Sequence, residues 1–249
     1  METIGSSRTV LTVLLFATLA ALAAVLGTLP FHRSRPVPDI IVGFAYALAS
    51  GLMLGAGYIL LTAGLERKTL PVLAGAGLGV MYTFWTHRYS GVTEITAEPA
   101  ERRGPGSVID IVLLNSLHSA SEGVAIGVAM VVGVKLGIFI AVSLAIHNIA
   151  ESMVLTDVVR AGRTPPPRAA GLAIVTNLPQ ILLAVVAFGV ARTVPEFEVW
   201  GLGFAAGAMV YLVFTELLPH AYERTGRTRV ALVVSSATGV IVLLRGFLA

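Results

Sequence analysis

The sequence of 249 residues contains no cysteine. This absence excludes a disulfide framework, a thiolate zinc site, an iron–sulfur centre and a cysteine nucleophile. Charge is scarce as well, because Asp, Glu, Lys and Arg make up 12% of the chain, against about 25% in ordinary globular proteins. With 56% hydrophobic residues and a mean hydropathy of +0.86, a compact sphere of this length could not cover its surface with polar groups. A soluble monomer is thereby excluded, and an integral membrane protein remains.

Eight apolar stretches follow one another along the chain, each long enough to cross a hydrocarbon core about 30 Å thick. Prolines, glycines and charged clusters separate them. We expect transmembrane helices at about 9–30, 38–64, 69–87, 108–133, 137–158, 168–191, 198–219 and 229–248. No soluble domain fits between them, so residues 1–249 are predicted to form one all-α membrane domain. The longest connection, 88–107, mixes Arg with Glu and is predicted to be a flexible cytoplasmic loop.

Lysine and arginine are divided unequally between the two sides of this eight-helix layout. Eleven fall on one side: Arg33, Arg35, Arg88, Arg102, Arg103, Arg160, Arg163, Arg168, Arg224, Arg227 and Arg229. Six fall on the other: Arg8, Arg67, Lys68, Lys135, Arg192 and Arg245. Cytoplasmic loops of membrane proteins carry the excess of positive charge. The first side is therefore predicted to be cytoplasmic, with both termini outside the inner membrane.

Two pairs of segments resemble each other. Ala-Ser-Gly-Leu-Met-Leu (49–54) is similar to Ala-Ala-Gly-Ala-Met-Val (205–210), and His-Ser-Ala-Ser-Glu-Gly (118–123) to His-Asn-Ile-Ala-Glu-Ser (147–152). In the predicted layout the two copies of each pair cross the bilayer in opposite directions, as in the inverted repeats of transporters. Chance recurrence in apolar helices explains the first pair about equally well, but is a poor explanation of the doubled His-x-x-x-Glu motif.

That motif places an imidazole and a carboxylate on one helix face. His118 and Glu122 are four residues apart, as are His147 and Glu151, and both pairs lie near the middle of a predicted span. An isolated charge at that depth costs at least ~2.5–3.5 kcal/mol, so such residues face the protein interior and a partner. Four N and O donors predict a divalent cation site, suited to Zn²⁺ and also to Fe²⁺, Mn²⁺, Co²⁺ or Cd²⁺. The alternative is two His–Glu hydrogen bonds that lock the helices together.

Residues 117–123 and 146–152 resemble the signatures of the fourth and fifth helices of ZIP (Zrt/Irt-like) divalent-metal transporters, above all of the bacterial branch. Residues 51–54, 203–209 and Glu-Leu-Leu-Pro (216–219) extend the resemblance over nearly the whole chain. It implies eight helices in a 3+2+3 arrangement with inverted repeats and both termini outside. A homodimer is also consistent with this resemblance.

The resemblance also assigns site residues. His118, Glu122, His147 and Glu151 match the primary transport site, and Met53 stands at a position whose sulfur can join it. Protons would compete with the metal for these ligands, so binding should weaken in acid.

ZIP proteins often have a second, adjacent metal position, and here this sequence departs from the family. Ser119 stands where Asn is usual, Asn148 matches the common Asn or Asp, and Gln180 occupies what resembles the place of a bridging Glu. Because these three side chains carry no negative charge, repulsion between two adjacent dications should disfavour double occupancy. We predict one strong site and at most a weak second.

Four polar residues near the predicted cytoplasmic helix ends are candidates for an exit pathway, although charged residues at helix ends are ordinarily interfacial. They are Asp110, Asp157, Glu216 and His220, with Glu216 the best match to the family. Met209 is expected to pack rather than bind metal. His87 is expected to be a solvated loop residue, and Gly75, Gly77 and Gly79 form a small-residue face suited to close helix packing or a subunit contact.

The predicted function is a transporter in the lipid bilayer that moves a divalent transition metal, Zn²⁺ first, toward the cytosol. The metal is its substrate and not a catalytic cofactor, and no nucleic-acid partner is expected. The alternative is an intramembrane metal-dependent hydrolase or oxidase. A zinc protease would need His-Glu-x-x-His on one helix, which is absent, and a di-iron centre would need four carboxylates where this midplane has two. A purely structural or receptor-like bundle is the third hypothesis.

Overall fold

The computed structural model describes residues 2–32, 37–90, 105–161 and 165–246. The helices of the amino-terminal half are α1 (Glu2–Thr28), a 3₁₀ turn at Leu29–His32, α2 (Asp39–Leu65), α3 (Thr69–Ser90) and α5 (Pro105–Val132). Those of the other half are α6 (Val134–Ala161), α7 (Pro166–Thr176), α8 (Leu178–Thr193), α9 (Pro195–Leu212), a π turn at Val213–Leu217, α10 (Leu218–Thr225) and α11 (Arg227–Arg245). The secondary structure of the described residues is thus entirely helical.

Seven helical stretches within these residues are long and apolar enough to cross a membrane. They are 9–31, 39–65, 109–132, 134–157, 167–193, 195–225 and 227–245. The remaining predicted span, 69–87, corresponds to α3, which is not among these seven and packs along α9. The prediction of an all-α integral membrane protein is confirmed. Residues 91–104 of the predicted loop, and Arg33, Arg35, Arg102, Arg103 and Arg163 of the charge count, lie outside the described residues.

Two of the predicted spans are interrupted. The span predicted at 168–191 is divided into α7 and α8 at Asn177, because Pro179 has no N–H to donate to the Val175 carbonyl and its ring crowds that group. The span predicted at 198–219 begins earlier, at Pro195, and contains the π turn directly before Pro219. The apolar residues continue through both breaks, so the hydropathy pattern predicts one continuous span in each place.

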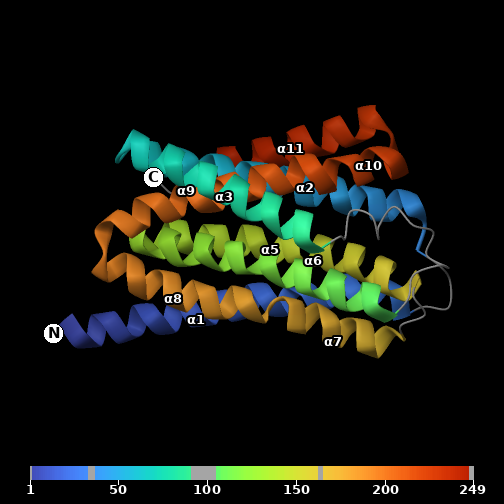
Figure 1. Ribbon diagram of the computed structural model, residues 1–249, viewed down its shortest axis with the longest axis horizontal. Helices are drawn as coiled ribbons and strands as arrows, with labels where there is room; N and C mark the ends of the chain where they lie inside the picture. The colour runs from blue at the N-terminus through green and yellow to red at the C-terminus, as the bar shows by residue number, and fades with distance from the viewer. Residues whose placement is uncertain (1, 33–36, 91–104, 162–164, 247–249) are drawn as a thin grey trace.

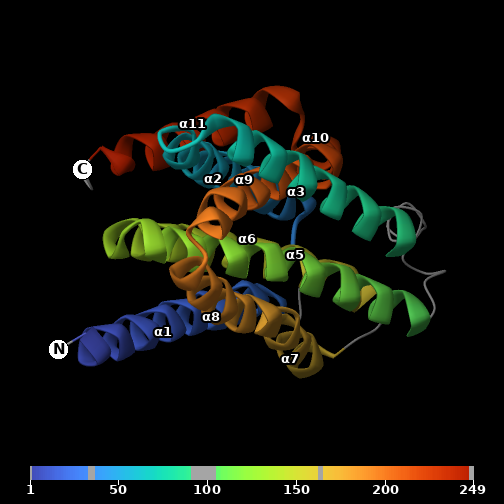
Figure 2. The same ribbon diagram turned by 60° about the vertical axis from the view of Figure 1, so that its left-hand side comes forward.

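The helices form two bundles. Bundle A consists of α1, α5, α6, α7 and α8, and bundle B of α2, α3, α9, α10 and α11. In Figure 2 the pair α5 and α6 lies between the layer of α1, α7 and α8 and the layer of bundle B. The bundles meet where α2 packs on α6 and where α5 packs on α9. Both termini lie at the same end of the molecule in Figures 1 and 2.

The packing pairs agree with the inverted repeat. The inverted repeat relates α1 to α8, α2 to α9, α3 to α11 and α5 to α6. When each helix is replaced by its counterpart, the α1–α6 pair becomes the α8–α5 pair. The same exchange converts α3–α9 into α11–α2, and α2–α6 into α9–α5, and all six pairs are in contact. The internal resemblance between the second and seventh helices, and between the fourth and fifth, thus has a counterpart in three dimensions.

The α3–α9 contact is a seam of glycines. A Cβ at Gly79 would collide with the carbonyl oxygen of Phe204, and one at Gly207 with the carbonyl oxygen of Ala76, whereas Gly77 faces open space. The expectation of close helix packing therefore applies to Gly79, and also to Gly75, which meets the Trp200 backbone. This seam holds α3 at a fixed register against α9.

Candidate metal centre

The first ligand group consists of Glu122 on α5 and of His147 and Glu151 on α6. Its donor atoms lie within 4.8 Å of one another, and all three residues are buried. His147 Nε2 lies 3.1 Å from Glu122 Oε1 and 3.9 Å from Glu151 Oε2. Only Gly133 separates α5 from α6, so the two helices return side by side and bring both motifs to one depth.

The polar atoms of this group are not satisfied by the protein. Apart from the 3.1 Å contact between them, both carboxylate oxygens of Glu122 and both ring nitrogens of His147 are buried without a well-formed hydrogen bond among the described residues. Leaving such a group unpaired costs about 1–3 kcal/mol, and more for a charge. One imidazole and two carboxylates, turned toward one point, are suited to a divalent cation.

The second ligand group consists of His87 on α3, His118 on α5 and Glu216 in the π turn. His87 Nε2 lies 2.9 Å from His118 Nε2 and 3.5 Å from Glu216 Oε2. The expectation that His87 is a solvated loop residue is wrong, because α3 continues to Ser90 and buries His87. Gly79, Thr83 and His87 follow one another at intervals of four along the face of α3 that packs on α9. This spacing is the feature of the sequence that indicates the burial of His87.

His118 is placed differently from the predicted arrangement. The sequence places it with Glu122 in one four-residue centre, whereas in the structure its Nε2 faces His87 of bundle B. Three of the four predicted primary residues thus share the first group, and the fourth belongs to the second group. Helical spacing puts His118 and Glu122 on one face but does not determine which neighbour each side chain contacts.

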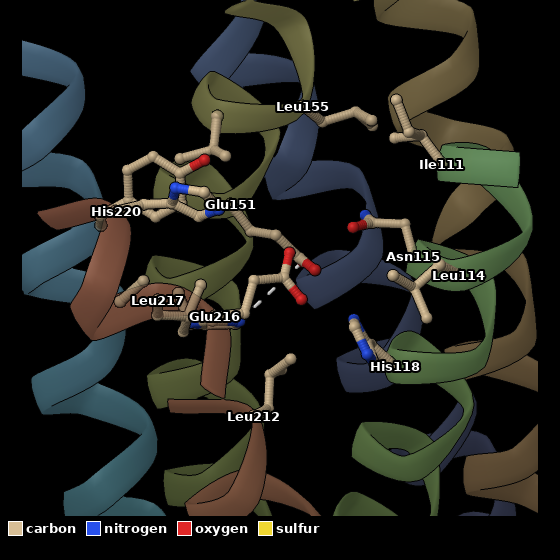
Figure 3. Close-up of a pocket in the computed structure, with 14 residues that line it drawn as sticks. Ile111, Leu114, Asn115, His118, Glu151, Leu155, Leu212, Glu216, Leu217 and His220 are labelled. Carbon is tan, nitrogen blue, oxygen red and sulfur yellow. Dashed lines mark ion pairs between the residues drawn. The ribbon is translucent and has the colours of Figure 1, made fainter. Parts of the chain in front are cut away.

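A cavity of about 40 Å³ connects the two groups. It is lined by His118, His147, Glu151 and Glu216, and also by Asn115 and His220. Figure 3 shows the carboxylates of Glu151 and Glu216 directed into the same space, opposite Asn115 and His118. A space of this size can hold a water molecule, and therefore also a metal ion.

The cavity extends to one side of the first group only. Its lining residues on α5 all precede Glu122, beginning at Ile111, and those on α6 start at His147 and continue to Leu155. This is the side on which α3 ends, α5 begins and α6 ends. It is the side that the distribution of Lys and Arg predicts to be cytoplasmic.

Glu216 reaches the cavity from an irregular stretch of helix. Pro219 cannot donate to the Thr215 carbonyl, and Leu218 N–H bonds instead to the Val213 carbonyl in π-helical fashion. Such single π turns are frequent at functional sites. Here the turn brings the carboxylate opposite His87.

Comparison with known proteins agrees with this arrangement. Residues 94–248 match the family model of the ZIP zinc transporters. The chain belongs to the ZIP family. It is 30% identical over 227 residues to a putative zinc transporter of Arabidopsis thaliana, covering 88% of this chain and 36% of the plant protein. It is 28% identical over 228 residues to the zinc transporter GufA of Myxococcus xanthus, covering 82% of this chain and 86% of that protein.

ZIP proteins are membrane transporters, so family membership supports a transporter and not the alternative of a metal-dependent hydrolase or oxidase. The chain spans about a third of the length of its plant relative but most of the length of GufA.

Of the three residues that family resemblance assigns to a second metal position, Asn148 and Gln180 are hydrogen-bonded to each other. Asn148 Nδ2 donates to Gln180 Oε1 at 2.8 Å and to the Ala20 carbonyl at 3.0 Å, so that α6 is tied to α8 and α1. Ser119 Oγ is buried without a hydrogen-bond partner among the described residues. Met53 is fully buried in the apolar core on α2, as is Met209 on α9.

The exit candidates divide into two sets. Glu216 and His220 line the cavity. Asp157 instead forms an ion pair with Arg224, with its Oδ2 2.9 Å from Arg224 Nη1. Asp110 is half-buried near the start of α5 and is not among the residues that line the cavity.

Proposed function

We propose that this ZIP protein carries divalent transition metal ions, Zn²⁺ first and also Fe²⁺, Mn²⁺ or Cd²⁺, across the cytoplasmic membrane toward the cytosol. The observation that carries the proposal is the first ligand group, whose buried imidazole and carboxylates face one another next to a cavity. The names of the two relatives and of the family support zinc as the substrate.

The position of the cavity supports this direction. With the termini outside, as the charge distribution predicts, the cavity extends from Glu151 past Glu216 and His220 to the cytosolic side. An ion held by the first group would pass to the second group and then leave. The other half of a transport cycle requires the two bundles to move so that the first group faces the outside. A homodimer stays a prediction from family resemblance.

We assign the strong site to Glu122, His147 and Glu151. His118, the fourth residue of the predicted site, belongs to the second group and lines the same cavity. Met53 stays a candidate sulfur ligand from the side of α2. Because Asn148 and Gln180 are neutral and bonded to each other, we propose that a second adjacent ion binds weakly at most.

Zinc uptake by liposomes tests the proposal. Purified protein should accumulate radioactive zinc, and Glu122→Gln or His147→Ala should abolish uptake, because either change removes a ligand from the first group. Glu66→Gln is the matched control, since this carboxylate is exposed at the far end of α2 and should leave uptake unchanged. Uptake that survives both ligand changes in folded protein would contradict the assignment.

A further inference from the structure

Several polar contacts join bundle A to bundle B on the cavity side, and three of them are geometrically well defined. They are the His87–His118 contact, a hydrogen bond from Tyr82 OH to the Leu117 carbonyl, and the Arg224–Asp157 ion pair. The first two involve the second ligand group or its neighbour on α5. The ion pair is separate from both ligand groups, and it connects α10 to α6.

Arg224 is held firmly in place. Its Nη1 lies 2.9 Å from Asp157 Oδ2, and both side chains are 28% exposed. The guanidinium carbon lies 5.9 Å from the centre of the Tyr46 ring, close enough for a cation–π contact. That ring is in turn 5.3 Å from the ring of His220, which lines the cavity. Because the guanidinium is planar and pre-organised, it loses little freedom for each interaction that it forms.

Asp157 acts on the helix that carries the first ligand group. It follows Glu151 by six residues on α6, a rise of about 9 Å along the helix. A restraint at Asp157 therefore limits how far His147 and Glu151 can shift relative to bundle B.

Arg224 also contacts a carboxylate of its own bundle. Asp39, at the start of α2, lies 3.5 Å from the same Nη1, but its side chain is 86% exposed. One guanidinium therefore makes an ion pair between the bundles and, in addition to its contact with the Tyr46 ring, an ion pair within bundle B. The pair of carboxylates allows the two effects to be separated by experiment.

We propose that the Arg224–Asp157 ion pair is a clasp between the bundles, which stabilises the conformation with the cavity on the α10 side of the ligand groups. The clasp rests on the proposed function, because it affects transport only if the bundles move relative to each other. When they move, the ion pair must break while the Arg224–Asp39 contact can persist. Removing Asp157 therefore shifts the population away from this conformation, and removing Asp39 does not.

The absence of cysteine provides a direct test, since a single introduced thiol is labelled without background. Leu217→Cys places a thiol in the cavity wall, where Figure 3 shows Leu217 beside Glu216. The rate of its reaction with a membrane-impermeant thiol reagent, applied to vesicles from the α10 side, measures how often the cavity is open. In this background Asp157→Asn should lower the equilibrium constant for this conformation about fivefold, which corresponds to about 1 kcal/mol of lost stabilisation, and should thereby slow labelling. Asp39→Asn should leave the rate unchanged.

Exchanging the charges of the Arg224–Asp157 ion pair tests whether the pair itself is responsible. The double variant Asp157→Arg with Arg224→Asp should restore labelling toward the parent rate, because the pair is re-formed with its ends reversed. Circular dichroism and gel filtration establish that each variant is folded, and Asp157→Asn alone suffices if the double variant does not fold. An unchanged rate in folded Asp157→Asn, or equal slowing by Asp39→Asn, would overturn the clasp.

Failure of the proposed function gives a different result. If the parent protein takes up no metal in liposomes while Asp157→Asn still slows labelling, the clasp stands and metal transport does not. If uptake is normal and labelling does not respond to Asp157→Asn, transport stands and the clasp is wrong.

Discussion

The first ligand group belongs to one bundle, whereas the second joins both. Glu122, His147 and Glu151 lie on the α5–α6 pair, so their relative positions do not change when the bundles move as rigid bodies. The second group takes His118 from bundle A and His87 and Glu216 from bundle B, so it is complete only in one arrangement of the bundles. The first group is therefore suited to hold an ion through a transport cycle, and the second to receive it in one conformation.

The largest expected effect concerns the first group. Glu151→Ala should weaken zinc binding about 100-fold, the upper end of what perturbing the surroundings of a metal site costs, because a direct carboxylate ligand is lost. Glu216→Ala should weaken it about tenfold at most. Isothermal titration of purified protein measures both. If the two changes weaken binding equally, the distinction between the groups is lost.

The packing of α3 on α9 should affect the second ligand group and not the first. Gly79→Ala would force α3 away from α9 and should destabilise the protein by about 1–3 kcal/mol, the usual cost of overpacking. His87 would be displaced while the first group kept its geometry. Thermal unfolding in detergent gives the loss of stability, and Gly77→Ala is the control, since that position faces open space. Equal destabilisation by both changes would contradict the described seam.

His87 separates binding from release. His87→Ala should slow zinc uptake about tenfold, as removal of one supporting group at a metal site does, and should leave equilibrium binding to the first group nearly unchanged. The neighbouring Arg88 is exposed, so Arg88→Ala should alter neither quantity. Uptake assays in liposomes and binding titrations together test this. A loss of binding equal to the loss of uptake would place His87 in the first group.

The smallest expected effect concerns a second ion beside the first group. Titration should give one strong zinc site per chain, and Gln180→Glu should add a weak second by supplying the missing charge. The same change keeps an acceptor oxygen for Asn148 Nδ2 but places a carboxylate at a fully buried position, so stability is measured alongside. Two sites of similar affinity in the parent protein, both retained in His87→Ala, would show that neutral residues do not prevent double occupancy.

Much of the fold could be predicted because apolar length and turn residues are local signals. The breaks before Pro179 and Pro219 were missed, because apolar periodicity continues through both. The site was predicted only in part. His147 and Glu151 are neighbours by helical spacing, but His87 has no motif around it and acquires its role from the register of α3 against α9.

The class of the protein and its chemistry can be derived from the sequence alone. Too little charge and long apolar runs require a membrane, and the doubled His-x-x-x-Glu motif requires imidazole and carboxylate at one depth. Which donors meet is visible only in the folded protein: His118 with His87, Glu122 with His147, and Asp157 with Arg224. The physical reason is that spacing along one helix specifies a face, whereas contact between residues on different helices depends on how close the backbones approach and in which register they pack.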